Sequence, residues 1–497
     1  MKIYKLGVLI CLQLVASISF SKTYYVSPTG KPGNDGTSFN TALTFAKAVT
    51  LVAAGDNIIL QGGTYTIPFV TAQKNTILFT NSGTTTKPIR VTVFNNLRAT
   101  FDFSYPKQEW IQDGVGFSIT GSYWYFNGIS ITRAGYQGAY VKGAFNTFEN
   151  CSFYDNRNTG LEINKGGSNT TVINCDSYHN YDPKKGGSMA DGFGPKETQG
   201  PGNKFIGCRA WENSDDGYDC YNSAEKVIFQ NCWAFRNGVD IWNYGGFSGN
   251  GNGFKVGGNF KQANHKLTNC VAFGQPQKGF DQNNNTGGIT IYNCTSYSNG
   301  TNFGLINNLN SGQTHDLKND ISLSGPVAIS NAIVSHNTWS AGFAVSTDDF
   351  ESVDLSLANT IRNGDGSLPE TKLFRLKTGS ALIDKGINVG LPFSGKAPDL
   401  GAFESKASST TARLSEDTIV NLYPTEVQDE LKIEMEQPFD EESTISIYSL
   451  QGGKIHSKTN IKDGMATISC QALSPGIYVG VIENNQGVVR KIKFIKK

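Results

Sequence analysis

Cysteines preceded by asparagine or glycine recur at a regular spacing along the middle of this 497-residue chain. They occupy positions 151, 175, 208, 232, 270 and 294, so the successive steps are 24, 33, 24, 38 and 24 residues. A base period of about 24 residues with occasional insertions is typical of a solenoid. Because segments such as 253–256 resemble short strands and no long helical pattern occurs, we expect an all-β fold, a parallel β-helix of about seven to ten coils.

The cysteine spacing also indicates whether the thiols are buried in the core or bind a metal. One cysteine per coil in the same register predicts an inward stack of small apolar side chains. No Cys-x-x-Cys pair occurs among the nine cysteines, which argues against a zinc site. Cys220 lies outside this register, and its role stays open.

The composition argues against some classes of binding partner. Lys plus Arg is 43 and Asp plus Glu is 42, so the net charge is +1 and gives no electrostatic case for nucleic acid or an anionic membrane. The 56 glycines and the low charged fraction of 17% favour short strands joined by many turns. We expect a monomer.

The N-terminus has the pattern of an export signal. Lys2 and Lys5 precede an apolar run over residues 6–15, and Ser19 and Ser21 suit cleavage before Lys22. We therefore predict a signal peptide at residues 1–21 and a mature protein that is secreted or held at the cell surface. The run is too short to span a membrane.

The C-terminal end differs in composition from the middle. Small residues at 406–415 read as a linker, and alternating apolar residues in 416–497 predict a small antiparallel β-sandwich. Its landmarks Leu422-Tyr423-Pro424-Thr425 and Leu473-Ser474-Pro475-Gly476-Ile477-Tyr478 resemble the C-terminal sorting domain of the type IX secretion system, although that family usually has Asn where Thr425 stands. The resemblance implies the type IX machinery as a partner; the alternative is a carbohydrate-binding sandwich.

A second pattern, in which glycine precedes an apolar residue, follows most of the cysteines. The examples are Thr159-Gly160-Leu161, Asp191-Gly192-Phe193, Asp216-Gly217-Tyr218, Asn252-Gly253-Phe254 and Lys278-Gly279-Phe280. The residue before glycine lies 8 positions after its cysteine in three coils, but 16 after Cys175 and 20 after Cys232. Most inserted residues thus precede the same strand, and we expect them to wall a groove on one side of the solenoid.

Four carboxylates converge in this groove. Asp191 and Asp216 share a register position on adjacent coils, about 4.8 Å apart, with Asp215 and Asp219 close by. A single Asp-Gly is a common solvated turn, but this stacked set would repel strongly without a hard cation, and Ca²⁺ suits oxygen ligands best.

Lys255 occupies the register position of Asp219 one coil later. It could simply pair with Asp219 or Asp281. Beside a cation its pKa could instead be lowered, which would make the amine available as a general base.

These motifs resemble polysaccharide lyase family 9. The similarity runs from about Lys22 to Glu404, within a predicted catalytic domain of residues 22–405. Its most specific parts are 190–196, 200–203, 213–219 and 252–258. It implies a right-handed parallel β-helix with pectate lyase activity on an acidic plant cell-wall polysaccharide. Residue by residue, it implies Asp191, Asp215, Asp216 and Asp219 as calcium ligands and Lys255 as the catalytic base.

The implied reaction is a β-elimination on polygalacturonate. Lys255 would remove the C5 proton of a uronic acid while calcium bridges the enzyme and sugar carboxylates. Lys196 is a candidate to bind the substrate acid. Trp242 and Tyr244, in the long insert before Lys255, are candidates to stack on sugar rings; simple loop packing is the alternative.

Three other functions stay open. A rhamnogalacturonan I lyase of the same family would use the same elimination. A β-helix polygalacturonase would be a hydrolase, but none of the five histidines stands in the Gly-His-Gly segment typical of that class. A non-catalytic glycan-binding solenoid would need neither the aspartate cluster nor Lys255.

Overall fold

The computed structural model divides into two compact units, Met1–Lys406 and Ala407–Lys497. It describes residues 21–340 and 343–405 of the first unit and, in the second, 420–423, 426–435, 444–449, 454–460, 465–484 and 487–496. The predicted linker and all but one residue of the predicted signal peptide lie outside these ranges. Within the described residues, no helix is both long and apolar enough to cross a membrane.

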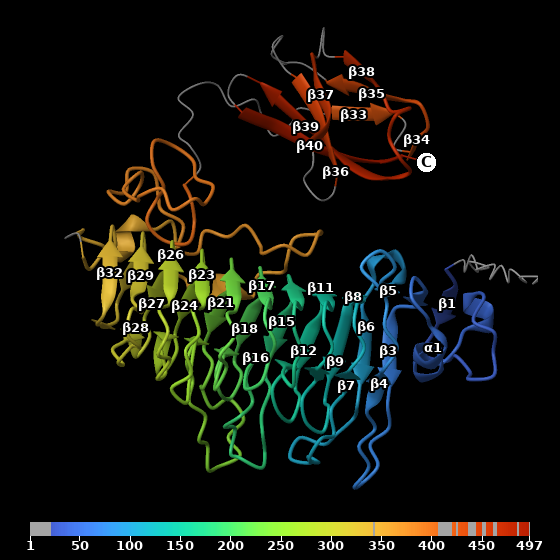
Figure 1. Ribbon diagram of the computed structural model, residues 1–497, viewed down its shortest axis with the longest axis horizontal. Helices are drawn as coiled ribbons and strands as arrows, with labels where there is room; N and C mark the ends of the chain where they lie inside the picture. The colour runs from blue at the N-terminus through green and yellow to red at the C-terminus, as the bar shows by residue number, and fades with distance from the viewer. Residues whose placement is uncertain are drawn as a thin grey trace, which may run out of the picture. The chain divides into compact units, whose positions relative to one another are not determined.

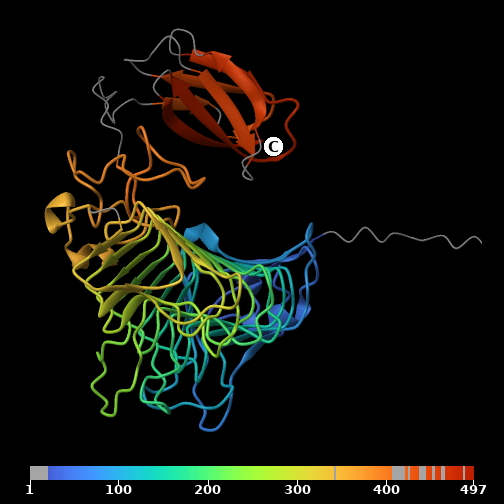
Figure 2. The same ribbon diagram turned by 60° about the vertical axis from the view of Figure 1, so that its left-hand side comes forward.

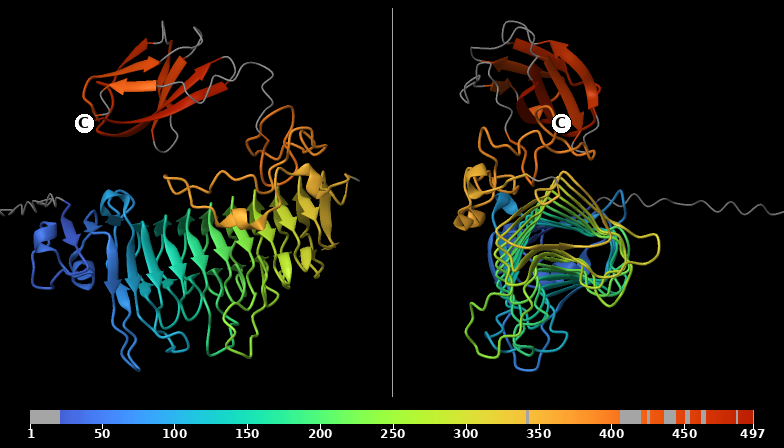
Figure 3. Two further views of the ribbon diagram at one scale, coloured as in Figure 1. Left: turned by 180° about the vertical axis from the view of Figure 1, so that it is seen from behind. Right: turned by 90° about the vertical axis from the view of Figure 1, so that its left-hand side faces the viewer.

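The first unit is a parallel β-helix, as predicted (Figure 1). Ten successive coils each contribute one strand to each of three parallel sheets, here called A, B and C, and sheet A has one further strand at either end. The coils superimpose when viewed along the solenoid axis (Figure 3). Sheet A has twelve strands and sheets B and C have ten each, which agrees with the upper end of the expected number of coils.

The strands of each sheet follow one another along the solenoid axis. Sheet A contains β1 (Thr23–Val26), β2 (Asn57–Leu60), β5 (Ile89–Val93), β8 (Trp124–Asn127), β11 (Thr147–Glu149), β14 (Thr171–Ile173), β17 (Lys204–Ile206), β20 (Ile228–Gln230), β23 (Lys266–Thr268), β26 (Thr290–Tyr292), β29 (His315–Lys318) and β32 (Ala332–Ser335). Sheet B contains β3 (Gly63–Thr66), β6 (Ala99–Asp102), β9 (Ile129–Thr132), β12 (Ser152–Tyr154), β15 (Asp176–Tyr178), β18 (Arg209–Trp211), β21 (Trp233–Phe235), β24 (Val271–Phe273), β27 (Thr295–Tyr297) and β30 (Ile321–Leu323). Sheet C contains β4 (Ile77–Phe79), β7 (Phe117–Ile119), β10 (Ala139–Val141), β13 (Leu161–Ile163), β16 (Phe193–Pro195), β19 (Tyr218–Asp219), β22 (Phe254–Lys255), β25 (Lys278–Asp281), β28 (Thr301–Leu305) and β31 (Val327–Ile329).

Helices are few and short. The described residues contain one α-helix, α1 (Phe45–Leu51), which packs at the N-terminal end of the solenoid with Phe45, Ala48 and Val49 buried. The 3-10 turns are η1 (Phe39–Thr41), η2 (Phe94–Asn96), η3 (Thr347–Asp349) and η4 (Leu355–Asn359).

Two inward stacks confirm the repeats seen in the sequence. All six cysteines of the 24-residue repeat are buried and free, as is Cys220. The aromatic residues that follow the repeated glycines stack along sheet C, with ring centroids 5.3 Å apart from Phe193 to Tyr218, 4.6 Å from Tyr218 to Phe254 and 5.1 Å from Phe254 to Phe280. These separations follow the interstrand spacing, so each coil fixes the next by burying one ring on another.

A third stack is polar, and it was not among the features predicted from the sequence. Amide side chains lie exactly five residues after each repeated cysteine, at Asn156, Asn180, Asn213, Asn237, Gln275 and Asn299. Nδ2 of each of the first three donates to Oδ1 of the next, over 3.0, 2.8 and 2.9 Å. This buried ladder satisfies backbone groups at the turn between sheets B and C, where strand pairing stops.

The C-terminal part of the first unit covers the outside of sheet B. Phe350, Leu373 and Phe374 are buried in one cluster with Trp233 and Phe273. Two arginines pair with one partly buried carboxylate of β15: Arg209 Nη2 lies 3.0 Å from Asp176 Oδ2, and Arg362 Nη2 lies 2.6 Å from Asp176 Oδ1. Residues 343–405 are thereby held on sheet B.

The two long inserts precede β16 and β22, on the side predicted (Figures 1 and 2). They contact each other, because Ser248 N–H donates to Gly186 C=O over 2.8 Å and Ser248 Oγ donates to Lys185 C=O over 2.6 Å. The inserts therefore form one projecting wall beside sheet C.

The second unit has the predicted antiparallel sheets. One has three strands, β33 (Val420–Tyr423), β35 (Glu430–Met435) and β38 (Met465–Ser469); the other has five, β34 (Glu426–Val427), β40 (Gly487–Lys496), β39 (Gly476–Asn484), β36 (Thr444–Ser449) and β37 (Lys454–Asn460). Only β34 and β40 pair in parallel among these strands. Leu431, Ile445, Ile468, Ile482 and Phe494 contribute to its own buried core.

The amide ladder generates a stability prediction. Replacing Asn213 with Leu leaves Asn180 and Asn237 without their buried partners, which should lower the free energy of unfolding by about 3 kcal/mol or more. Urea unfolding followed by tryptophan fluorescence checks this, because all six tryptophans lie between residues 110 and 339. Asn308→Leu, at an exposed position, is the control. An equal loss of unfolding free energy in both variants would contradict a stabilising role for the buried amide ladder.

Candidate active site

The outer face of sheet C carries the predicted polar column. Asp219 on β19 pairs with Lys255 on β22, which pairs in turn with Asp281 on β25. Asp191 and Asp216 each stand two residues before Phe193 and Tyr218, which pair with each other. Parallel register therefore brings these aspartates onto adjacent coils, as expected from the sequence.

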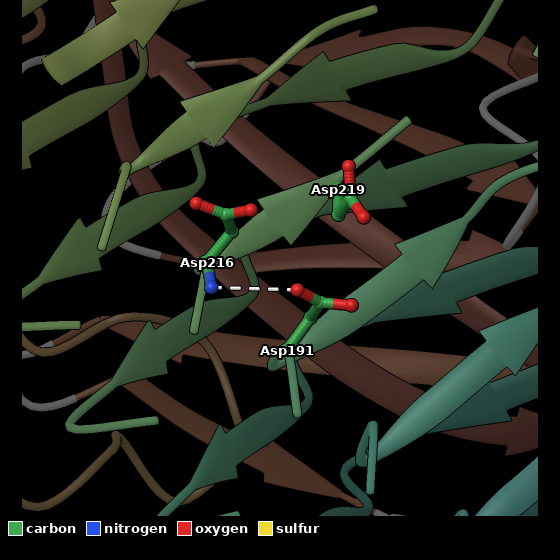
Figure 4. Close-up of side chains that lie close together, drawn as sticks. All are labelled: Asp191, Asp216 and Asp219. Atoms are coloured by element: carbon green, nitrogen blue, oxygen red, sulfur yellow. Dashed lines mark hydrogen bonds between the residues drawn. The ribbon is translucent and has the colours of Figure 1, made fainter. Parts of the chain in front are cut away.

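Three of the four predicted aspartates form a compact cluster. Asp191, Asp216 and Asp219 are buried, and each offers a carboxylate oxygen within 4.8 Å of the others. Figure 4 shows the three side chains around one small space, with the backbone N–H of Asp216 donating to Asp191 Oδ1 over 3.3 Å. Such close carboxylates repel one another unless positive charge lies among them.

Lys255 supplies part of that charge. Its Nζ lies 2.9 Å from Asp216 Oδ2 and 3.5 Å from Asp219 Oδ1, and 5.6 Å from the centroid of the Tyr221 ring. The other oxygen of Asp216 accepts hydrogen bonds from the backbone N–H and the Nδ2 of Asn252, both over 2.8 Å. Asp216 is thus fixed from both sides, with one oxygen turned to Lys255.

Lys196 supplies the rest of the charge. Its Nζ lies 2.6 Å from Asp191 Oδ2 and 3.6 Å from Asp219 Oδ2, and the residue is only 5% exposed. Asp219 therefore lies between two ammonium groups. In this state Lys196 orients aspartates and has little surface with which to meet a substrate.

The charges of the cluster shift its pKa values. Burial lowers the pKa of Lys255 and of Lys196, but attraction to the neighbouring aspartates outweighs burial and holds both pKa values well above the usual range. A lowered pKa of Lys255 beside a bound cation stays a prediction. Burial, with repulsion from Asp191 and Asp216, raises the pKa of Asp219 to about 7.

Asp215 lies beside the cluster but is turned toward the inserts. Its Oδ2 accepts the backbone N–H of Met189 and its Oδ1 accepts that of Asn250, both over 2.7 Å. Burial and repulsion from Asp216 and Asp191 raise the pKa of Asp215 to about 8. The carboxylate therefore clamps the two inserts together at the edge of the cluster.

The donor set fits a divalent cation. The three clustered side chains offer only hard oxygen ligands, which suit Ca²⁺ rather than a metal that prefers sulfur or imidazole. Two ammonium groups lie among the same oxygens and neutralise part of their charge. The three carboxylates can therefore bind a metal, in competition with the ammonium groups of Lys196 and Lys255.

Comparison with known proteins identifies the solenoid. Residues 24–319 match the family described as "Pel9A-like, right handed beta helix region". The chain belongs to this Pel9A-like family. Residues 421–497 match the secretion system C-terminal sorting domain, so the protein is secreted or located at the cell surface.

Relatives cover nearly the whole solenoid. Pectate lyase L of Dickeya dadantii (strain 3937) is 56% identical over 392 residues, which cover 79% of this chain and 92% of the relative. The crystal structure of pectate lyase Pel9A is 56% identical, with a TM-score of 0.77, over 78% of this chain and 98% of that one. A rhamnogalacturonan lyase structure is 30% identical, with a TM-score of 0.62, over 72% of this chain and 97% of that one.

In this Pel9A-like chain, Trp242 and Tyr244 pack within the inserts. Their ring centroids lie 5.0 and 5.2 Å from that of Tyr181, and the Trp242 ring stacks on Phe247 at 6.4 Å. The two residues stiffen the wall that Asp215 clamps. A role of either ring in stacking on sugar stays a prediction.

The clamp generates a prediction about the inserts. Asp215→Ala removes the acceptor shared by Met189 and Asn250, so the amides of both inserts should exchange hydrogen about tenfold faster or more. Hydrogen-exchange mass spectrometry of peptides covering 182–190 and 239–250 measures this. Asp219→Asn is the matched control and should leave both inserts protected; unchanged exchange in Asp215→Ala would contradict the clamp.

Proposed function

We propose that this protein is a calcium-dependent pectate lyase that cleaves polygalacturonate by β-elimination, with Lys255 as general base. The main support is the position of Lys255 Nζ, 2.9 Å from Asp216 within a cluster of buried carboxylates. The similarity to pectate lyases over most of the solenoid supports the same reaction class. Export through the sorting domain suits a polymer that cannot enter a cell.

Asp191, Asp216 and Asp219 would hold the cation, with Asp215 at the edge of the site. When bound, calcium would draw charge from the uronate carboxylate and acidify the neighbouring C5 proton. The chain's part in metal binding is to hold the carboxylates in place. Asn252 Nδ2 donates a hydrogen bond that fixes Asp216, and Lys196 Nζ donates one that fixes Asp191.

Lys255 would then act as the base at C5. Its pKa is a balance between burial, which favours the neutral amine, and the aspartates, which favour the ammonium. If a bound cation neutralised those aspartates, burial would lower the pKa of Lys255, and Nζ could then accept a proton. The C5–H electron pair forms the C4–C5 double bond as the C4–O bond breaks, and the leaving sugar takes up a proton.

A second candidate activity is the cleavage of rhamnogalacturonan I. The similarity to a rhamnogalacturonan lyase structure at 30% identity favours it, because the same elimination serves both polymers. The higher identity to pectate lyases makes polygalacturonate the first choice.

The reaction and the polymer can be tested together. Purified protein mixed with polygalacturonate should give ultraviolet absorbance from an unsaturated uronide, and a calcium chelator should abolish it reversibly. Rhamnogalacturonan I serves as the parallel substrate and should give a much smaller signal. New reducing ends without absorbance would show hydrolysis and contradict the proposal.

The role of Lys255 predicts a specific loss. Lys255→Ala should lower kcat by about 10²–10⁴-fold, the usual contribution of a general base. Lys255→Arg should be equally inactive, because a guanidinium stays protonated. Steady-state kinetics and thermal melting separate lost chemistry from lost folding, with exposed Lys204→Ala as the control; full activity in Lys255→Arg would exclude a base at this position.

A further inference from the structure

A cavity of about 600 Å³ opens on the same outer face of sheet C, toward the N-terminal end of the solenoid. It lies over β4, β7 and β10; Figure 1 labels β4 and β7. Its lining mixes apolar and polar side chains and includes three lysines. The lining residues are Lys74, Asn75, Thr76, Leu78, Asp113, Val115, Ser118, Tyr140, Lys142 and Lys165. None of these residues belongs to the aspartate cluster.

The cavity carries uncompensated positive charge. Lys74 Nζ lies 3.4 Å from Asp113 Oδ2, but both side chains are more than half exposed, so this pair is weak. Among the residues that the structure describes, Lys142 and Lys165 form no ion pair. Lys142 Nζ instead lies over the Tyr140 ring, 4.6 Å from its centroid, and burial together with repulsion from Lys165 lowers its pKa.

Register connects this cavity to the candidate active site. Among the outward positions of sheet C, Ser118 pairs with Tyr140, Tyr140 with Glu162, and Glu162 with Gly194. Phe193 pairs with Tyr218 on the next coil, so Asp219, which follows Tyr218, has the same register position as Gly194. From Tyr140 to Lys255 there are four coil steps, or about 19 Å at about 4.8 Å per step. The cavity and the aspartate cluster thus lie on one straight face.

Lysine positions also follow this line. The backbone N–H of Asn164 donates to Val141 C=O and that of Lys196 donates to Ile163 C=O, so Lys142, Asn164 and Lys196 occupy one register. Two acidic residues, Glu162 and Glu197, lie between the two sites. The Glu162 carboxylate accepts from Gln137 and Asn164 and the residue is only 5% exposed, so it presents little charge to a ligand above it. Glu197 is exposed, and its Oε2 accepts a hydrogen bond from Asn164 Nδ2 over 2.8 Å.

We propose that the cavity lined by Lys142 and Lys165 is a distal subsite, which binds carboxylates of the same polyuronate chain several sugars away from the bond that is cleaved. The proposal rests on the proposed function, since it needs a polymer of acidic sugars lying along sheet C. Two ammonium groups that form no ion pair within the described residues match such a chain, whose carboxylates repeat along its length. A small anion could occupy the cavity but could not bridge it to the aspartate cluster.

The test removes this charge alone. In Lys142→Gln/Lys165→Gln, KM for long polygalacturonate should rise about tenfold while kcat stays unchanged, because the subsite binds substrate and transition state equally. KM for a trimer, which is too short to span the two sites, should not change. The control Lys47→Gln/Lys204→Gln removes two exposed lysines elsewhere and should behave as wild type.

A binding measurement keeps the subsite separate from the reaction. Calorimetry with a long oligogalacturonate in the presence of chelator should show about tenfold weaker binding to the double variant than to the control. If the wild type forms no unsaturated product, the proposed function fails whatever the calorimetry gives. If the double variant matches the control in both KM and calorimetry, or if its trimer KM rises equally, the subsite proposal is overturned.

Discussion

Repulsion among buried carboxylates is the constraint on which the candidate site depends. Stacking coils about 4.8 Å apart forces any acidic residues in one register to lie close together. Asp191, Asp216 and Asp219 accept this arrangement because Lys196 and Lys255 lie between them. The same two lysines occupy the oxygens that a cation would use, so metal binding and the protonation of Lys255 are coupled.

The rest of the solenoid holds this charged patch still. Aromatic rings stack beneath sheet C, the amide ladder fixes the turn before it, and Asp215 joins the two inserts beside it. Residues 343–405 pack on sheet B, which leaves the polar face of sheet C to the substrate. Rigidity matters for the proposed role of Lys255, because a general base must be held within hydrogen-bond reach of the proton that it removes.

Much of this was predictable from sequence because a parallel solenoid converts sequence period directly into spatial neighbours. The cysteine and glycine registers placed Asp191, Asp216, Asp219 and Lys255 together. The amide ladder had an equally clear signal, five residues after each cysteine, but a mixture of Asn and Gln hid it. The direction of Asp215 was not predictable, because it depends on amides of two irregular inserts, and the covering of Lys196 depends on side-chain geometry that spacing does not reveal.

The most direct test of the account is calcium affinity measured by calorimetry in the wild type and in Lys255→Ala. Because the ammonium of Lys255 competes for Asp216, the variant should bind Ca²⁺ at least as tightly as the wild type. Loss of calcium binding in Lys255→Ala would contradict it, because Lys255 would then support the metal site instead of competing with the cation.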